Sequence, residues 1–148
     1  MIAVLQRARD AEVSIDNALS GAIDHGLVIL LGVFEGDSEE DAEYLAEKSA
    51  HLRIFNDDEQ KMNYSIQDVG GSVLVVSQFT LCADTRKGRR PSYIQAAPPD
   101  RANQLYQYFI QQLRDWELPV ESGEFGAMMD VRLTNTGPVT IILDSNNR

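Results

Sequence analysis

The sequence predicts a mixed α+β fold with elements in the order β-β-β-α-β-α-β-β-β. Several short runs alternate apolar and polar residues or are rich in β-branched residues, which is typical of strands. Two longer segments, 39–52 and 100–116, instead repeat apolar residues at helical spacing. The chain has 148 residues, 43% of them hydrophobic, which is enough to bury a substantial core. We therefore expect residues 1–148 to form one domain.

Three strands are expected at the start of the chain. Residues 2–4 and 13–15 alternate, and residues 17–21 are rich in turn-forming types, so they are expected to connect the second strand to the third. Residues 27–34 are an uninterrupted apolar run, which is typical of a strand covered on both faces. We expect this third strand to be central in its sheet.

The first helix is expected to begin after Ser38. A serine followed by three acidic residues supplies an N-cap and places negative charge where the helix dipole favours it. One apolar stripe follows at helical spacing, formed by Ala42, Leu45, Ala46, Ser49 and Leu52.

In the second half of the chain, Gly70 and Gly71 precede a strand expected over 73–80. A second helix is expected to start around Asp100, after two prolines. Its inner side is predicted to carry Leu105, Tyr108, Phe109, Leu113 and Trp116. Segments around Val120, 128–133 and 139–143 are expected to be the closing strands.

Composition excludes several classes of function. Cys82 is the only cysteine, so an internal disulfide is impossible, and no Cys/His cluster offers a metal site. The longest apolar run is far too short to span a membrane, and no signal-like segment opens the chain. We expect a cytoplasmic protein with no membrane partner, no metal and no cofactor.

The net charge of −10 argues against broad contact with a nucleic-acid backbone. One local exception is a cluster of four cations within five residues, Arg86, Lys87, Arg89 and Arg90. Charge alone favours a solvated loop here. The cluster nevertheless follows the segment 77–81 closely, and it is large enough for a local phosphate contact.

Two motifs stand at the edges of apolar, β-branched runs. Residues 77–81 read Ser-Gln-Phe-Thr-Leu, and residues 135–140 read Asn-Thr-Gly-Pro-Val-Thr. A Gly-Pro step between strand-like segments forces an irregular backbone, whose displaced polar groups can face a ligand. Taken alone, the first motif is also compatible with a buried strand whose hydroxyls bond to neighbours, and the second with an ordinary trans turn.

A nucleophilic hydroxyl needs an adjacent base, and the chain has only two histidines, His25 and His51. Neither lies in a nucleophile-elbow context. Strand alternation places Gln78 and Thr80 on one face and Ser77 with Phe79 on the other. A Ser-His-Asp hydrolase is therefore the weaker interpretation.

Together the two motifs resemble those of the D-aminoacyl-tRNA deacylases. The resemblance extends over essentially the whole chain, through segments 5–7, 30–33, 52–55, 61–63 and 83–92. It implies a three-layer α/β/β domain with mixed sheets, in which helices cover one sheet that packs on another. It also implies a homodimer with active sites at the subunit interface, acting on the 3′ end of an aminoacyl-tRNA.

The resemblance further implies roles for individual residues. The Thr80 side chain would position groups, while the N–H groups of Phe79 and Thr80 stabilise an oxyanion during substrate-assisted ester hydrolysis. Ser77 and Gln78 would orient the terminal adenosine, and Phe79 would form an apolar wall.

Gly137 and Pro138 would form a cis peptide that enters the partner's site, where its carbonyls reject L-amino acids. Arg7 would support this loop, Met129 would line the pocket, and the cationic cluster would contact tRNA. Thr136 departs from the family, which commonly has an acid there.

Two other functions are compatible with the sequence. A hydrolase of small D-amino acid esters or amides would suit the acidic charge and would need no tRNA. A non-catalytic dimer that docks on RNA through residues 86–90 would bind without turnover. The first alternative predicts equal activity on free esters, and the second predicts no effect of changing Gly137 or Pro138.

Overall fold

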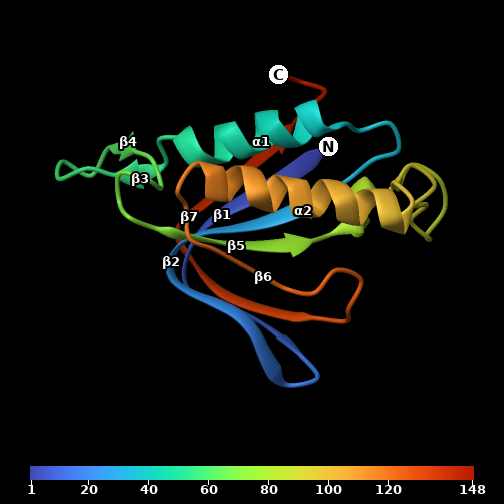
Figure 1. Cartoon of the computed structure of the whole chain (residues 1–148), viewed down its shortest axis with the longest axis horizontal. Coiled ribbons are helices and arrows are strands. Elements are labelled where there is room, and N and C mark those ends of the chain that lie inside the picture. The colour runs from blue at the N-terminus through green and yellow to red at the C-terminus, as the bar shows by residue number, and fades with distance from the viewer.

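The computed structural model describes residues 1–148, and it places two helices side by side over one face of a five-stranded sheet (Figure 1). The sheet has the order β6-β5-β2-β1-β7, and a separate two-stranded sheet is formed by β3 and β4. The strands are β1 (Ile2–Ile15), β2 (Ala18–Gly32), β3 (Phe55–Asn56), β4 (Met62–Tyr64), β5 (Ser72–Ser77), β6 (Val120–Ser122) and β7 (Asp130–Asp144). The helices are α1 (Glu39–His51), the 3₁₀ helix η1 (Phe79–Cys82) and α2 (Pro99–Asp115).

Strand directions are mixed, as predicted. β1 pairs antiparallel with β2 and β7, whereas β5 runs parallel to both β2 and β6. β2 is the middle strand, so the prediction that the apolar run 27–34 is central is confirmed up to Gly32, where the strand ends. The mixed α+β class is likewise confirmed.

The structure has seven strands, as predicted, but their order along the chain is β-β-α-β-β-β-α-β-β. Two long strands replace the three expected at the start, and the turn between them lies at Asp16 and Asn17, both with positive φ. The polar stretch around Asp10 hid the continuity of β1, because a bulge there breaks the alternation without ending the strand. Residues 128–133 and 139–143 likewise belong largely to the single strand β7, and the β3–β4 hairpin was not predicted.

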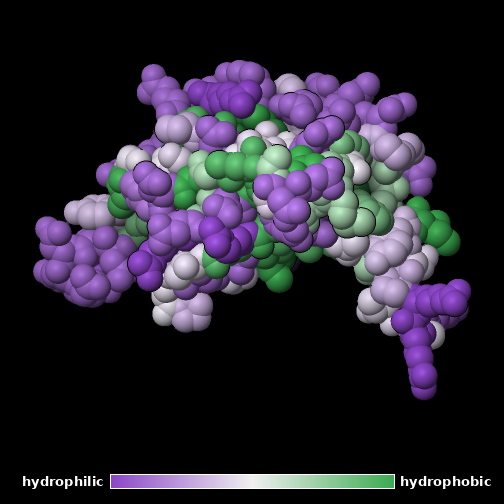
Figure 2. All heavy atoms as spheres, turned by 90° about the horizontal axis from the view of Figure 1, so that it is seen from below, coloured by the Kyte–Doolittle hydropathy of each residue, from purple (hydrophilic) through white to green (hydrophobic).

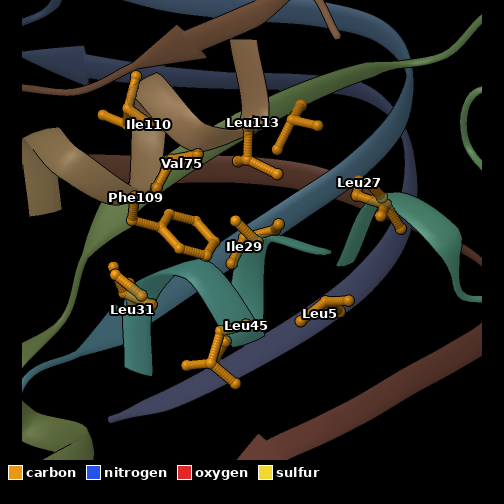
Figure 3. Packing of buried hydrophobic residues seen from close by; sticks show 14 of the residues in the cluster. Leu5, Leu27, Ile29, Leu31, Leu45, Val75, Phe109, Ile110 and Leu113 are labelled. Atoms are coloured by element: carbon orange, nitrogen blue, oxygen red, sulfur yellow. The ribbon is translucent and has the colours of Figure 1, made fainter. Parts of the chain in front are cut away.

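Two hydrophobic clusters lie on opposite faces of the sheet. The larger one lies under the helices, where Phe109, Leu45, Ile29 and Leu5 pack together (Figure 3). The smaller one lies on the other face and contains Ala8, Ala11, Val13, Ile23, Val28, Leu74 and Val76. In Figure 1, β1, β2 and β7 curve away from the helices, so their distal halves cover this second cluster. Three layers therefore arise from one bent sheet rather than from two separate large sheets.

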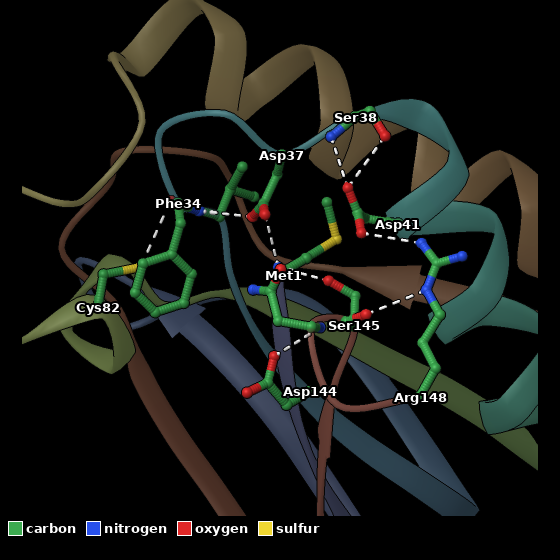
Figure 4. A network of polar contacts seen from close by, with 11 residues as sticks. Met1, Phe34, Asp37, Ser38, Asp41, Cys82, Asp144, Ser145 and Arg148 are labelled. Carbon is green, nitrogen blue, oxygen red and sulfur yellow. Dashed lines mark hydrogen bonds and ion pairs between the residues drawn. The ribbon is translucent and has the colours of Figure 1, made fainter.

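Helix α1 begins as predicted, with Ser38 as the N-cap. The backbone N–H and hydroxyl of Ser38 donate to Asp41 Oδ2 at 2.8 and 3.0 Å, and Arg148 donates to the other oxygen at 3.0 Å (Figure 4). The amino group of Met1 is buried nearby and donates to Asp37 at 2.7 Å. These contacts fasten both ends of the chain to the start of α1.

The inner face of α2 is largely as predicted. Leu105, Phe109 and Leu113 are buried, but Trp116 lies beyond the helix and is 38% exposed, which contradicts its predicted place in the core. Tyr106 and Ile110, which were not predicted, are buried instead.

None of the helices combines the length and the apolar character that a membrane span requires.

Candidate active site

A cavity of about 540 Å³ opens where β5 ends, between the start of α2 and residues 125–131. Thirteen of its 18 lining residues are hydrophobic. Five residues predicted for the site line this one cavity, namely Ser77, Gln78, Phe79, Thr80 and Met129. An apolar cavity with a few convergent polar groups is the usual form of a small-molecule site.

The predicted extension of β5 to Thr80 is wrong. The strand ends at Ser77, and η1 begins two residues later. The N–H of Gln78 donates to the carbonyl of Leu31 at 2.8 Å, which fixes the end of the strand. The helical turn then brings the side-chain amide of Gln78 into a hydrogen bond with the Thr80 hydroxyl. The side chains of Gln78 and Thr80 are therefore held together by the helical turn and not by the predicted strand.

The turn also frees two backbone donors. Phe79 and Thr80 are the first residues of η1, where N–H groups have no partner within the helix. Neither N–H takes part in the backbone hydrogen bonds formed by turns, loops and caps. Both residues line the cavity, so these two N–H groups are available to a bound ligand.

Tyr106 forms part of the cavity wall. Its hydroxyl donates to the carbonyl of Val75 at 2.9 Å, and its ring packs near that of Phe125. Burial raises the pKa of Tyr106 to about 12, so the phenol stays protonated at neutral pH. On the outer side, the rings of Phe79 and Tyr93 meet edge to face at 5.0 Å.

The cavity wall contains no carboxylate and no imidazole. His25 lies near the carbonyl of Val69, and the Nδ1 atom of His51 lies 2.8 Å from the carbonyl of Glu47, so neither histidine lines the cavity. Cys82 is buried, and burial raises its pKa to about 11. The cavity therefore offers no side chain that could activate a hydroxyl nucleophile.

The Gly137–Pro138 segment forms a protruding loop within β7. Gln6 pairs with Thr140 and Ala8 pairs with Asn135, so residues 136–139 all stand opposite Arg7 alone. The Gly137–Pro138 peptide is cis, as the resemblance implied. Gly137 has φ +132°, and a Cβ there would lie 2.8 Å from Arg7 Nη2. The positive φ therefore favours glycine at this position, and a Cβ would also force the Arg7 side chain to move.

Two side chains hold this loop. Arg7 Nε donates to the carbonyl of Thr136 at 2.9 Å. On the other side, the Asn135 side chain accepts from the N–H of Val139 at 2.8 Å and donates to the Thr140 hydroxyl at 2.9 Å. The loop is thus held at Thr136 through a backbone oxygen and needs no acidic side chain there. Asn135 was part of the motif 135–140 but was given no role, although an asparagine beside irregular backbone is a recognisable signal.

Within one chain the loop and the cavity are not brought together. Neither Gly137 nor Pro138 lines the cavity, whereas Thr136 and Arg7 line a shallow depression elsewhere, beside His25 and Asn56. The loop therefore does not contribute to the cavity of its own chain in this conformation.

The cationic cluster lies in a closed loop beside the cavity. Asp84 and Ser92 exchange backbone hydrogen bonds at 2.8 and 2.9 Å, which closes residues 84–92. Arg86 binds Asp84 through two nitrogens and lowers the pKa of that carboxyl to about 2. The other three cations form no ion pair. The loop 84–92, which is yellow-green in Figure 1, joins two segments that line the cavity, 77–80 and 96–99.

The chain matches known proteins along nearly its whole length. Residues 4–144 match the family model described as D-Tyr-tRNA(Tyr) deacylase. Curated relatives named D-aminoacyl-tRNA deacylase include one from Halalkalibacterium halodurans, 57% identical over 98% of this chain and 99% of that protein. Another, from Thermus aquaticus, is 57% identical over 100% of this chain and 97% of that protein.

Solved structures that share the fold include the following two. One is described as c-Myc DNA Unwinding Element Binding Protein, with a TM-score of 0.91, 38% identity, and coverage of 97% of this chain and 98% of that chain. The other is a probable eukaryotic D-amino acid tRNA deacylase, with a TM-score of 0.79, 20% identity, and coverage of 96% and 97%. From the match along nearly its whole length, the chain belongs to the D-Tyr-tRNA(Tyr) deacylase family.

Proposed function

We propose that the protein hydrolyses the ester bond between a D-amino acid, or mischarged glycine, and the 3′ end of tRNA. The observation that carries this proposal is the cavity at Ser77–Thr80, which is apolar, lacks a general base and presents two free N–H groups. Such a site suits an ester that is already reactive and needs only orientation and charge stabilisation. The proposed setting is the cytoplasm, where charged tRNA is present.

The proposed mechanism relies on the substrate for activation. The 2′-hydroxyl beside the ester assists the attacking water, and the N–H groups of Phe79 and Thr80 stabilise the oxyanion. One such donor is typically worth about 2.7–4 kcal/mol of transition-state stabilisation. Because Gln78 donates to the Thr80 oxygen, the O–H group of Thr80 is left free to donate to the substrate. Thr80 is thus a positioning donor rather than a nucleophile.

Thr80→Ala is expected to retain measurable hydrolysis, because the backbone N–H of residue 80 remains. Loss of one neutral hydrogen bond predicts a decrease in kcat/KM of about tenfold. Single-turnover release of D-tyrosine from D-tyrosyl-tRNA measures this effect. Complete loss of turnover with unchanged binding would identify Thr80 as the nucleophile.

The chirality filter is proposed to act between subunits of a homodimer. Large apolar side chains near the cavity and along β7 are exposed, including Met128 at 90% and Ile142 at 66%. Figure 2 views the side opposite the helices, where apolar residues are exposed in the middle of the face among hydrophilic ones. A second copy covering this face would bring its Gly137–Pro138 loop to the cavity, where backbone carbonyls exclude the side chain of an L-residue.

The loop 84–92 is proposed to contact the tRNA backbone through Lys87, Arg89 and Arg90. Replacing all three with alanine should raise KM for D-tyrosyl-tRNA with little change in kcat. The slope of log KM against log salt should decrease by about 0.7–0.9 for each tRNA phosphate that the altered loop no longer neutralises. An unchanged salt slope would identify this loop as a solvated surface segment.

The deciding experiment compares release of D-tyrosine and L-tyrosine from tyrosyl-tRNA, with D-tyrosine ethyl ester as a third substrate. Rapid release of D-tyrosine from tRNA alone supports the proposal. Equal activity on the free ester would instead identify a small-ester hydrolase. Release from none of the three, with tRNA binding intact, would identify a binding module.

A further inference from the structure

The β3–β4 hairpin, residues 54–64, is linked to the Gly137–Pro138 loop through a single side chain. Arg7 Nη1 donates to the carbonyl of Ile54 at 2.8 Å and to Asn56 Oδ1 at 3.1 Å. Its Nε donates to the carbonyl of Thr136 at 2.9 Å. One guanidinium therefore bridges two segments that are about 80 residues apart in the chain.

The geometry of a guanidinium makes this bridge directional. Its donors form a rigid planar fork, so bonds on one edge fix the orientation of the other edge. The Nη2 atom lies so close to Gly137 that a Cβ there would be only 2.8 Å away. Rotation of the Arg7 group would therefore break its hydrogen bond to the Thr136 carbonyl beside Gly137.

The hairpin is itself organised around Asp57. Its Oδ1 atom accepts from the N–H groups of Glu59 and Lys61, both at 2.9 Å, and its other oxygen accepts from the Asn63 side chain. The N–H groups that bond to the carboxylate, Lys61 first, lower the pKa of Asp57. These bonds set the turn directly after Asn56, and they give segment 61–63 a structural role.

Much of the hairpin has no comparable packing role. Met62 and Tyr64 are exposed, and the hairpin extends from one end of the molecule (Figure 1). Only its base is buried, at Ile54 and Phe55. The contacts made at the base with Arg7 are thus its main connection to the Gly137–Pro138 loop.

We propose that the β3–β4 hairpin is a positioning element for the Gly137–Pro138 loop, acting through the contacts of Ile54 and Asn56 with Arg7. The proposal rests on the function proposed above, because it assigns the hairpin a part in the choice between D- and L-amino acids. Asn56 is the residue through which it can be tested, since its side chain contacts Arg7 while the Ile54 contact is made by backbone.

The test uses the full-length protein and three variants. Asn56→Ala removes the side-chain acceptor, whereas Asn56→Asp keeps an acceptor at the same place. Glu59→Gln is the matched control, because it disrupts an exposed ion pair with Lys61 in the same hairpin without touching Arg7. For each protein, the ratio of kcat/KM for D- and L-tyrosyl-tRNA is measured beside the thermal midpoint.

Asn56→Ala should lower the D/L ratio about tenfold, since a hydrogen bond to a charged donor is removed. Asn56→Asp should restore the ratio, and Glu59→Gln should leave it unchanged. A D/L ratio that stays at the wild-type value in Asn56→Ala would overturn the inference. So would a ratio that falls equally in the control, because that result indicates a general loss of order in the hairpin.

Amide hydrogen exchange of residues 134–141 gives a second measurement that does not depend on activity. Exchange in this segment should become faster in Asn56→Ala and should be unchanged in Glu59→Gln. If the wild-type protein fails to discriminate D from L, the proposed function fails, and exchange alone decides whether the hairpin holds the loop. Equal exchange in all four proteins would overturn the inference.

Discussion

Gly137→Ala is expected to lower the preference for D- over L-tyrosyl-tRNA by a factor of roughly 10 to 100. Gly137 has φ +132°, which L-residues rarely adopt, and a Cβ there would meet both Arg7 Nη2 and Val139 Cγ2 at 2.8 Å. Backbone strain of this kind costs about 1–3 kcal/mol, so the native loop would be depopulated by a comparable factor. Release of D- and L-tyrosine under single-turnover conditions measures the change.

Gly36→Ala is the matched control for this experiment. Gly36 also has a positive φ, +94°, but a Cβ there would meet nothing within 4 Å, and Gly36 does not line the cavity. The Gly36→Ala variant should be less stable than the wild-type protein but should keep the wild-type D/L ratio. If Gly137→Ala folds and keeps the wild-type D/L ratio, the loop is not the filter.

Local patterns predicted the parts of this protein that depend on local physics. The cap at Ser38 and the following acids marked the start of α1, because a helix terminus is satisfied by its nearest neighbours. The run 27–34 indicated a central strand, because such a strand is covered on both faces. The motif 77–81 pointed to the cavity even though its secondary structure was wrongly predicted.

Contacts between distant residues could not be derived in this way. Arg7 reaches residues 47, 49 and 129 positions away, and no local pattern encodes the choice of those acceptors. The β3–β4 hairpin was missed because its strands have only two and three residues, too short for alternation to be visible. The predicted break between the first two strands was also wrong at Asp10, where a bulge resembles a turn in sequence.

Because the loop and the cavity lie apart within one chain, a mixed dimer can distinguish a loop that acts in its own subunit from one that acts in the partner. Two variants are needed, Gly137→Ala in the loop and Ala127→Trp to fill the cavity, which Ala127 lines. In the proposed homodimer, a mixed dimer of the two variants would contain one site with a native cavity from one subunit and a native loop from the other. Two different carboxyl-terminal tags allow the mixed dimer to be purified. The tags are placed at this end because the Met1 amino group is bonded to Asp37.

If the loop acts between subunits, the mixed dimer should hydrolyse D-tyrosyl-tRNA at about half the wild-type rate and keep the wild-type D/L ratio. If the loop acts within its own subunit, the only open cavity belongs to the chain with the altered loop, and the ratio should be as low as in Gly137→Ala alone. A dimer of wild type with Ala127→Trp should discriminate in both cases and serves as the control. The roughly 10- to 100-fold gap between the two outcomes follows from the strain at Gly137, so one ratio decides which subunit supplies the filter.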